Sequence, residues 1–272
     1  MRFVSFKKNN QAAIGALVAN KNTVVDLTES GLPADLTSFI EMGEEGLRMA
    51  ETAIRNGAQI PIAELKILAP FPRPRRNVMC VGKNYFEHSK EFEKSGFDST
   101  SGGQTVPDAP VIFTKATTSI TGPGEPIPAS SDPSDSTDYE GELGVVIGRS
   151  GRSISKAEAF NYIFGYTIIN DVTARNLQQR HKQWFLGKSL DGFCPMGPQL
   201  VTADEIDDVT SLNVRTRVNG ELRQDACVKD LIFDIPTIIE TLSSLFTLVP
   251  GDIIAPGTPA GVGIGFKPPK FL

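Results

Sequence analysis

Two glutamates stand two residues apart in an otherwise apolar segment, YEGELGVVIG, at residues 139–148. The alternating pattern predicts a strand, and side chains two apart on a strand point to the same face of a sheet. Glu140 and Glu142 therefore share one face. Val145 and Ile147 belong to the opposite face, which is apolar and suited to a core. Two carboxylates on a buried strand repel each other and lose hydration, so they require a compensating cation.

A third carboxylate, Asp171, directly follows the next apolar segment, YTIIN (166–170). Three carboxylates that leave coordination positions open suit a hard, oxygen-binding ion such as Mg²⁺ or Mn²⁺. The alternative is a solvated strand face on which the two glutamates bind no ion. The spacing alone leaves both interpretations open.

Composition argues against several classes of protein. With 27 Lys and Arg against 32 Asp and Glu, the net charge of −5 disfavours nucleic acid or an anionic membrane surface as a partner. No segment approaches the roughly 18 continuous apolar residues of a membrane-spanning helix. Two histidines are too few for a histidine-rich zinc site. Three cysteines without a CxxC pair favour a reducing, cytoplasmic compartment.

The chain divides into two predicted units. In residues 1–70, alternating apolar and polar residues predict short antiparallel strands, and the apolar spacing from Leu36 to Asn56 predicts an amphipathic helix. The segment APFPRPRR (69–76) suits a linker, or else a loop within one domain. We predict a small N-terminal α/β domain at 1–70 and a larger domain at 71–272. Many short strands and few helices in the second unit indicate a mixed, β-rich α+β core with a roll-like form.

A polar, glycine-rich segment with no single periodicity follows at residues 86–110. Its length and composition indicate either disorder or a mobile lid over a site, with the lid at about residues 92–110. Its first residues contain His88, three residues before Glu91. If a helix begins near Tyr85, the two side chains share one helix face.

A carboxylate that accepts a hydrogen bond from one imidazole nitrogen leaves the other nitrogen free to act as a general base. The alternative for His88 is an exposed histidine among charged neighbours. The second histidine, His181 in QQRHKQ, fits a solvated position on a helix.

Two further segments hold polar residues on irregular backbone. Lys188 lies in LGKSLDGFCPMGP, from which it could reach an anionic or enolate oxygen, or it could be a surface lysine. PGTPAGVG (256–263) places Thr258 between Gly257 and Pro259, and such loops offer backbone N–H groups to carboxylates.

Taken in order along the chain, these segments resemble the fumarylacetoacetate hydrolase family. The matching segments are VGKNYFEHSKE, PVIFTK, DYEGELGVVIG, YTIINDVTARNLQ, QWFLGKSLDGFCPMGP, VNGELRQ and IIAPGTPAGVG. The resemblance implies a β-roll core of mixed strands as a metal-dependent catalytic domain, a small N-terminal domain, a homodimer and a lid after the histidine. It also implies roles for ten residues: metal ligands Glu140, Glu142 and Asp171; catalytic residues His88, Glu91 and Lys188; and substrate-binding residues Tyr85, Gln178, Gly257 and Thr258. The implied ion is Mg²⁺ or Mn²⁺, and Ca²⁺ could replace it in a crystal.

Three departures from the family pattern stand out. Lys83 occupies a position where an apolar residue is more usual, and it could add positive charge near the site. The lid is long and glycine-rich, so the substrate contacts of the family's lid cannot be assigned to residues of this segment. Members commonly continue into a further strand pair after the segment that ends here in KPPKFL, so either the core lacks its last strands or its terminus differs from that of the family.

The resemblance implies a divalent-metal-dependent enzyme that cleaves a C–C bond in a small 2-oxo or 1,3-dicarbonyl acid. The reaction would be acylpyruvate-type hydrolysis or 2-oxo acid decarboxylation, through a metal-bound enolate. One alternative on the same scaffold is an isomerase or dehydratase of aromatic or sugar-acid catabolism. Another is a non-catalytic metal-binding dimer. The expected partners are a small-molecule 2-oxo acid and a second copy of the chain, without nucleic acid or membrane.

Overall fold

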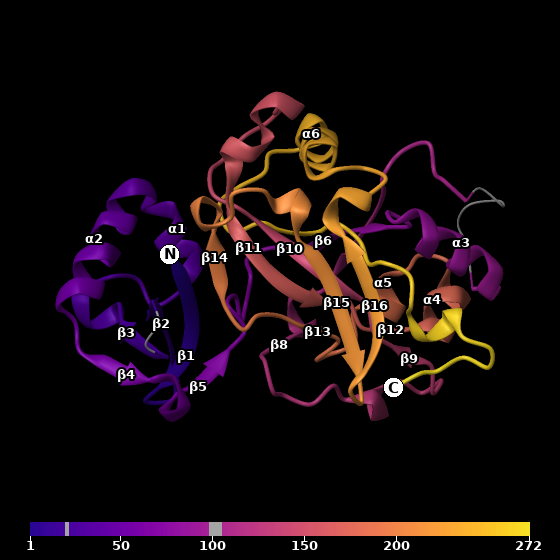
Figure 1. The fold of residues 1–272 in the computed structure, drawn as a ribbon, viewed down its shortest axis with the longest axis horizontal. Coiled ribbons are helices and arrows are strands. Elements are labelled where there is room, and N and C mark those ends of the chain that lie inside the picture. Colours follow the sequence, from indigo (N-terminus) through magenta and orange to yellow (C-terminus); the bar gives the residue numbers. More distant parts are fainter. Residues whose placement is uncertain (20–21, 98–104) are drawn as a thin grey trace.

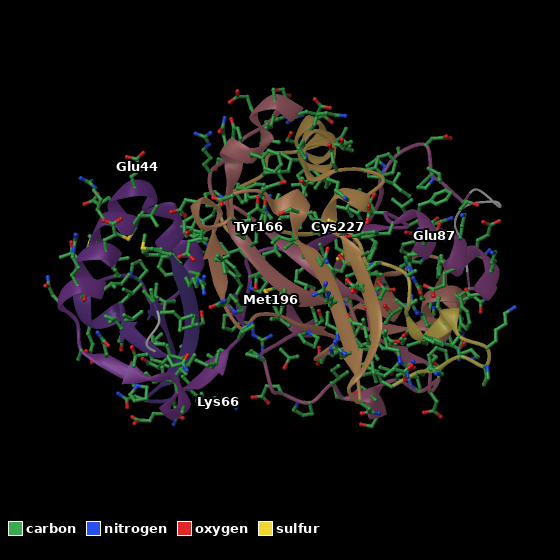
Figure 2. All side chains as sticks on the ribbon, in the orientation of Figure 1. Glu44, Lys66, Glu87, Tyr166, Met196 and Cys227 are labelled. Carbon is green, nitrogen blue, oxygen red and sulfur yellow. The ribbon has the colours of Figure 1, made fainter. Side chains whose placement is uncertain are left out.

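The computed structural model describes residues 1–19, 22–97 and 105–272. The N-terminal strands and helices form a lobe at one end of the molecule, and the remaining elements form a larger body beside it (Figure 1). Tyr166 and Met196 lie in the interior, whereas Glu44 and Glu87 point outward (Figure 2). The middle of the expected lid, residues 98–104, falls outside the described residues.

The elements lie as follows along the chain. The strands are β1 (Arg2–Lys8), β2 (Gln11–Val18), β3 (Thr23–Asp26), β4 (Gln59–Pro61), β5 (Lys66–Leu68), β6 (Val78–Gly82), β7 (Val111–Lys115), β8 (Ile120–Thr121), β9 (Thr137–Asp138), β10 (Gly141–Ile147), β11 (Ile163–Asn170), β12 (Thr173–Ala174), β13 (Cys194–Pro195), β14 (Leu200–Thr202), β15 (Asn213–Val218), β16 (Glu221–Cys227) and β17 (Ile253–Ala255). The α-helices are α1 (Leu36–Glu41), α2 (Gly43–Asn56), α3 (Phe86–Ser95), α4 (Arg175–His181), α5 (Phe185–Lys188) and α6 (Ile235–Leu245). Among the 3₁₀ helices, η5 (Lys156–Tyr162) and η9 (Gly263–Gly265) matter below.

One large sheet runs through both parts of the chain. Its strand order is β4-β3-β2-β1-β14-β11-β10-β17-β6-β7, and β5 pairs with β1 outside this path. Strands β17 and β6 run parallel, and the other neighbours in the sheet are antiparallel. One edge of strand β1 pairs with β14 along its first residues and with β5 farther along. The N-terminal strands therefore continue directly into the sheet of the larger body. The boundary at residue 70 stays a prediction.

Both faces of this sheet are covered around β10. Val146 belongs to a hydrophobic cluster that extends to Phe3 and Phe39 of the N-terminal lobe. Val145 and Ile147 belong to a second cluster, which α6 completes on the opposite face. Strand β10 is therefore buried on both faces, although its pattern predicted one apolar and one polar face. Burial on both sides explains why the two glutamates at its beginning lie in the protein interior.

Individual residues decide several local features of the fold. The Asn219–Gly220 turn joins β15 and β16, and both residues have the positive φ that such two-residue turns require. The helix predicted from Leu36 to Asn56 is broken into α1 and α2, because Gly43 has a φ of 60°. The segment after Ser155 is the 3₁₀ helix η5, and the Ser155 side chain makes no capping hydrogen bond. In the described part of the chain, no helix has the length and apolar character needed to cross a membrane.

Helix α6 begins at a capped end, and this yields a first prediction. Asp234 Oδ1 accepts a hydrogen bond of 2.8 Å from the backbone N–H of Thr237, which satisfies a donor that the first helical turn cannot pair. We expect Asp234→Ala to lower the free energy of unfolding by about 1 kcal/mol. Urea denaturation would measure it. The control is Ser155→Ala, which removes a hydroxyl group that makes no capping hydrogen bond at the start of η5. An equal loss in both variants would contradict the capping role.

Candidate metal centre

Three buried carboxylates meet where β10 begins and β11 ends. One oxygen from each of Glu140, Glu142 and Asp171 lies within 4.8 Å of the others, and all three side chains are buried. The antiparallel register pairs Gly141 with Asn170, so the beginning of β10 lies beside the end of β11. The backbone N–H of Asp171 also donates to the carbonyl of Glu140 at 2.8 Å. The structure thus brings together the three residues that the sequence predicts as metal ligands.

Buried cations surround two of these carboxylates. Lys188 Nζ lies 2.9 Å from Glu140 Oε2 and 2.7 Å from Asp171 Oδ2. Lys115 Nζ lies 2.7 Å from Asp171 Oδ1, and Arg175 Nη1 lies 2.6 Å from Glu140 Oε1. Because all three cations are buried, water screens these contacts little.

The cations lie closer to Glu140 than to Glu142, and the pKa values of the two glutamates shift in opposite directions. Burial alone would raise the pKa of Glu140, but Lys188 and Arg175 outweigh it and lower that pKa to about 2. Burial raises the pKa of Glu142 well above its usual range, and the charges of Asp171 and Glu140 raise it further. Burial would lower the pKa of Lys188, but Asp171 and Glu140 outweigh it and raise that pKa. The ammonium of Lys188 therefore stays charged.

Among the three carboxylates, Glu142 is the one that forms no ion pair within the described part of the chain. Its hydrogen-bond donor among the described residues is the backbone N–H of Gly257, at 2.8 Å from Oε2. A buried carboxylate with a single neutral donor is costly in its charged form. A divalent cation bound by oxygen ligands from Glu142 and its two neighbours would remove that cost. The residues present therefore fit Mg²⁺ or Mn²⁺.

His88 and Glu91 form a pair on α3. His88 Nδ1 lies 3.3 Å from Glu91 Oε2, and the Glu91 carboxylate also accepts from the backbone N–H of Gly261 at 3.1 and 3.2 Å. His88 is buried and stacks against Phe92 with a ring-centroid distance of 6.2 Å, so it is not an exposed histidine. His181, in contrast, is exposed.

The other predicted site residues lie in or beside the carboxylate cluster. Thr258 donates its hydroxyl to the carbonyl of Gly141 at 2.9 Å. Gln178 is buried and accepts from Arg175 Nη1 at 3.2 Å. Tyr85 is buried at the start of α3. The roles of these residues and of Gly257 in substrate binding stay predictions.

Comparison with known proteins identifies the family. The family model described as fumarylacetoacetate (FAA) hydrolase C-terminal matches residues 77–272. The chain belongs to the fumarylacetoacetate hydrolase family. This confirms the predicted family.

Relatives match nearly the whole chain. Oxaloacetate tautomerase YisK of Bacillus subtilis is 43% identical over 289 residues, which cover 100% of this chain and 93% of that protein. The structure of a fumarylacetoacetate hydrolase from the psychrophile Exiguobacterium antarcticum has a TM-score of 0.85 and 42% identity, covering 100% of this chain and 91% of that one. Maleylpyruvate hydrolase from Sphingobium sp. SYK-6, in complex with manganese(II) and pyruvate, has a TM-score of 0.77 and 31% identity, covering 97% and 90%. The mixed α+β fold predicted from the family resemblance is confirmed.

Three charged residues of this site were not predicted from the sequence: Lys115, Asp138 and Arg175. All three lie within the family-like segments, Lys115 at the end of an apolar strand and Asp138 two residues before Glu140. A charged side chain at the end of a buried strand is a usable signal, because burial without a partner would be costly. Lys83, which departs from the family pattern, is also buried and has a φ of 56°.

Proposed function

We propose that this chain is a divalent-metal-dependent enzyme that catalyses keto–enol tautomerisation of a small 2-oxo dicarboxylic acid such as oxaloacetate. The observation that carries the proposal is the coexistence of a His–carboxylate pair with a buried cluster of three carboxylates and three cations. The similarity to an oxaloacetate tautomerase over the whole chain supports the substrate class. The manganese(II) and pyruvate in the complex of a related hydrolase support the ion and the 2-oxo acid.

The chemistry follows from the side chains in the site. A bound Mg²⁺ or Mn²⁺, held by Glu140, Glu142 and Asp171, would add positive charge where the substrate carbonyl becomes negative. When Nδ1 of His88 donates to Glu91, Nε2 is free to take a proton from the carbon beside the ketone. Returning a proton to the oxygen completes the tautomerisation, and no other atom is gained or lost. Glu91 stabilises the imidazolium that exists between the two steps.

Buried cations are the candidates for stabilising negative charge on the oxygen atoms of the substrate. Lys188 lies between two of the candidate ligands, so its ammonium would stabilise negative charge on the substrate oxygen. Arg175 Nη2 is buried and has no hydrogen-bond partner among the described residues, which leaves its two N–H groups for a substrate carboxylate. Gln178 and Thr258 are the further candidates for that carboxylate.

The second candidate function is the C–C bond cleavage expected from the sequence, by hydrolysis of an acylpyruvate or by decarboxylation of a 2-oxo acid. The similarity to maleylpyruvate hydrolase favours hydrolysis in particular. In that reaction, His88 with Glu91 would activate a water molecule instead of accepting a proton from carbon. Assays of oxaloacetate tautomerisation and decarboxylation and of acylpyruvate and maleylpyruvate hydrolysis, each with Mg²⁺, Mn²⁺ or chelator, distinguish these functions. A protein that binds Mn²⁺ and converts none of these substrates would contradict all of them.

Replacing the proposed base gives a specific prediction. We expect His88→Asn to lower kcat for oxaloacetate tautomerisation by about 10²- to 10⁴-fold, the usual contribution of a positioned general base. Binding of Mn²⁺, measured by calorimetry, should stay close to wild type because His88 is not a proposed ligand.

The matched control is His181→Asn, since His181 is exposed. It should leave kcat unchanged. Full tautomerase activity in His88→Asn would refute the role of His88.

Location and assembly are parts of the same proposal. Cys80, Cys194 and Cys227 are free thiols, which supports a reducing, cytoplasmic environment. The homodimer rests on the family resemblance. Sedimentation of the purified protein tests it directly.

A further inference from the structure

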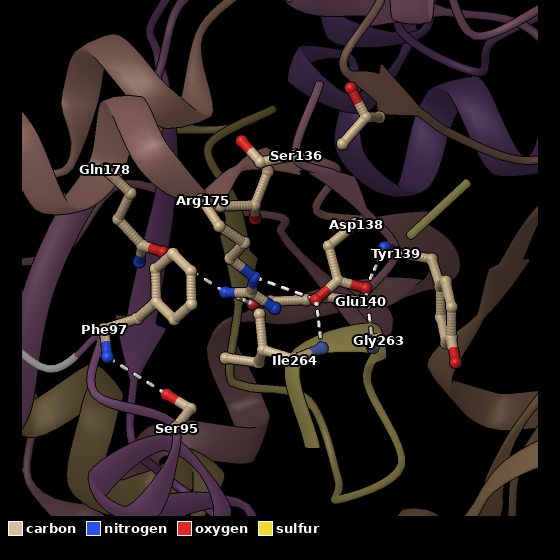
Figure 3. Close-up of polar contacts among 12 residues, drawn as sticks. Ser95, Phe97, Ser136, Asp138, Tyr139, Glu140, Arg175, Gln178, Gly263 and Ile264 are labelled. Carbon is tan, nitrogen blue, oxygen red and sulfur yellow. Dashed lines mark hydrogen bonds and ion pairs between the residues drawn. The ribbon is translucent and has the colours of Figure 1, made fainter. Parts of the chain in front are cut away.

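Asp138 lies at the meeting point of two parts of the site. Its side chain is fully buried on β9, two residues before Glu140. Oδ2 accepts hydrogen bonds from Arg175 Nε at 2.9 Å and from the backbone N–H of Ile264 at 3.1 Å. Oδ1 accepts from the backbone N–H of Gly263 at 2.6 Å and of Tyr139 at 2.9 Å (Figure 3). Four donors on one buried carboxylate fix its position closely.

One of these contacts leads to the candidate metal centre. Arg175 binds Asp138 through Nε and Glu140 through Nη1, so the planar guanidinium holds the two carboxylates at a set spacing (Figure 3). Without the charge of Asp138, the buried guanidinium would have Glu140 as its main anionic partner. It would then compete with a metal ion for the oxygens of Glu140.

The hydrogen bonds of Asp138 to the backbone of η9 connect it to the His88–Glu91 pair. Asp138 binds the backbone of η9 at Gly263 and Ile264, and the same loop binds the Glu91 carboxylate through the N–H of Gly261. The loop also packs directly on Glu91, because a Cβ added to Gly265 would lie 1.7 Å from Glu91 Oε1. A shift of η9 would therefore move the carboxylate that orients His88.

We propose that Asp138 is a positioning residue that sets the candidate ligand Glu140, through Arg175, and the carboxylate of Glu91, through the backbone of η9, in one fixed geometry. The inference rests on the proposed function, because it gives both ends of this connection a role in the reaction. Asp138 itself contacts neither substrate nor metal in this scheme. Its effect passes through Arg175 and the loop.

The test compares Asp138→Asn with a matched control at Asp132, which lies shortly before β9 in the chain. Asp132 is also buried and accepts from Ser134 and Ser136, but it touches neither Arg175 nor η9 among its hydrogen bonds. In Asp138→Asn we expect the Kd for Mn²⁺ to rise about tenfold and kcat to fall about 10- to 100-fold, as for other residues that orient metal ligands. KM should change little. Asp132→Asn should leave both the Mn²⁺ Kd and kcat within about twofold of wild type.

A double-mutant cycle tests the route through Arg175. Arg175→Lys keeps the charge but lacks the fork that spans Asp138 and Glu140. If Asp138 acts through Arg175, the effects of Asp138→Asn and Arg175→Lys on the Mn²⁺ Kd should not add in the double variant. Additive effects would overturn this route.

A measurement on the wild-type protein does not depend on whether any variant folds. Saturation with Mn²⁺ should slow hydrogen exchange at the amides of Gly263 and Ile264, although neither is a proposed ligand. The amides of Ser134 and Ser136, which bind Asp132, should change less. Equal slowing at both pairs would overturn the inference.

The two proposals fail in different ways. A wild-type protein that binds Mn²⁺ and converts no 2-oxo acid contradicts the proposed function. A wild-type protein that is active, with a folded Asp138→Asn variant of unchanged Mn²⁺ Kd and kcat, overturns the role of Asp138 alone. Equal losses in Asp138→Asn and Asp132→Asn also overturn it, because they would show a merely structural effect.

Discussion

Glu142→Gln should abolish Mn²⁺ binding and all metal-dependent turnover while leaving the metal-free protein as stable as wild type or more stable. Glutamine keeps an oxygen that can accept from the N–H of Gly257, so the local hydrogen bond survives. It lacks the charge that a divalent ion requires. We expect the Kd for Mn²⁺ to rise by more than about 100-fold, beyond the usual effect of residues that only orient a ligand.

In Glu142→Gln, the free energy of unfolding of the metal-free protein should stay the same or rise, whereas the activity should be lost. Because the folded protein raises the pKa of Glu142, the folded state binds that proton more tightly than the unfolded state. The metal-free wild type should therefore lose stability as the pH rises through the raised pKa, and Glu142→Gln should not show this loss. Binding of Mn²⁺ to the wild type should release a proton.

Calorimetry in buffers of different ionisation enthalpy measures the proton release, and urea denaturation across pH measures the stability. The control is Glu44→Gln, on the exposed side of α2, which should change neither (Figure 2). Turnover that persists in Glu142→Gln, or in the wild type with chelator, would contradict a metal centre at these carboxylates.

Lys188→Met should separate metal binding from catalysis. Removing the ammonium leaves Glu140 and Asp171 with less positive charge, so Mn²⁺ should bind more tightly than in the wild type. The same change removes a buried cation beside the reacting oxygen, and kcat should fall by about 10²- to 10³-fold. The metal-free variant should be destabilised by about 3–5 kcal/mol, because carboxylates that lose a buried partner are costly. Saturating Mn²⁺ should restore much of that loss.

The measurements for Lys188→Met are the Mn²⁺ Kd, kcat and thermal unfolding with and without Mn²⁺. Lys156→Met is the matched control, because Lys156 is exposed at the start of η5. It should alter none of the three. Weaker Mn²⁺ binding together with unchanged kcat in Lys188→Met would show that the ammonium serves only to hold the ligands.

The sequence could predict those parts of the site that depend on short spacing. Glu140 and Glu142 share a face because a strand repeats every two residues, and His88 meets Glu91 because a helix places residues three apart on one face. Asp171 was recognisable from its place directly after an apolar segment. All of these relations lie within one element or between neighbouring strands.

The ion pairs were not predictable in this way. Arg175 meets Asp138 across 37 positions of the chain, and Lys115 meets Asp171 although β10, β17 and β6 lie between β7 and β11 in the order of the sheet. No local pattern specifies such partners. The break between α1 and α2 was missed for a different reason, since apolar spacing continues across Gly43 while its positive φ interrupts the helix. Tertiary packing decided the ion pairs, whereas the backbone conformation of Gly43 decided the helix break.

The pairing of β1 with β14 has a consequence for how this chain can be divided. A shortened protein that began near residue 71 would leave the edge of β14 unpaired and would uncover the apolar side chains that pack against Phe3 and Phe39. Unpaired strand edges beside apolar surface promote self-association. We therefore expect that removal of the first 70 residues would make the remaining chain aggregate, so that its loss of activity would say nothing about catalysis.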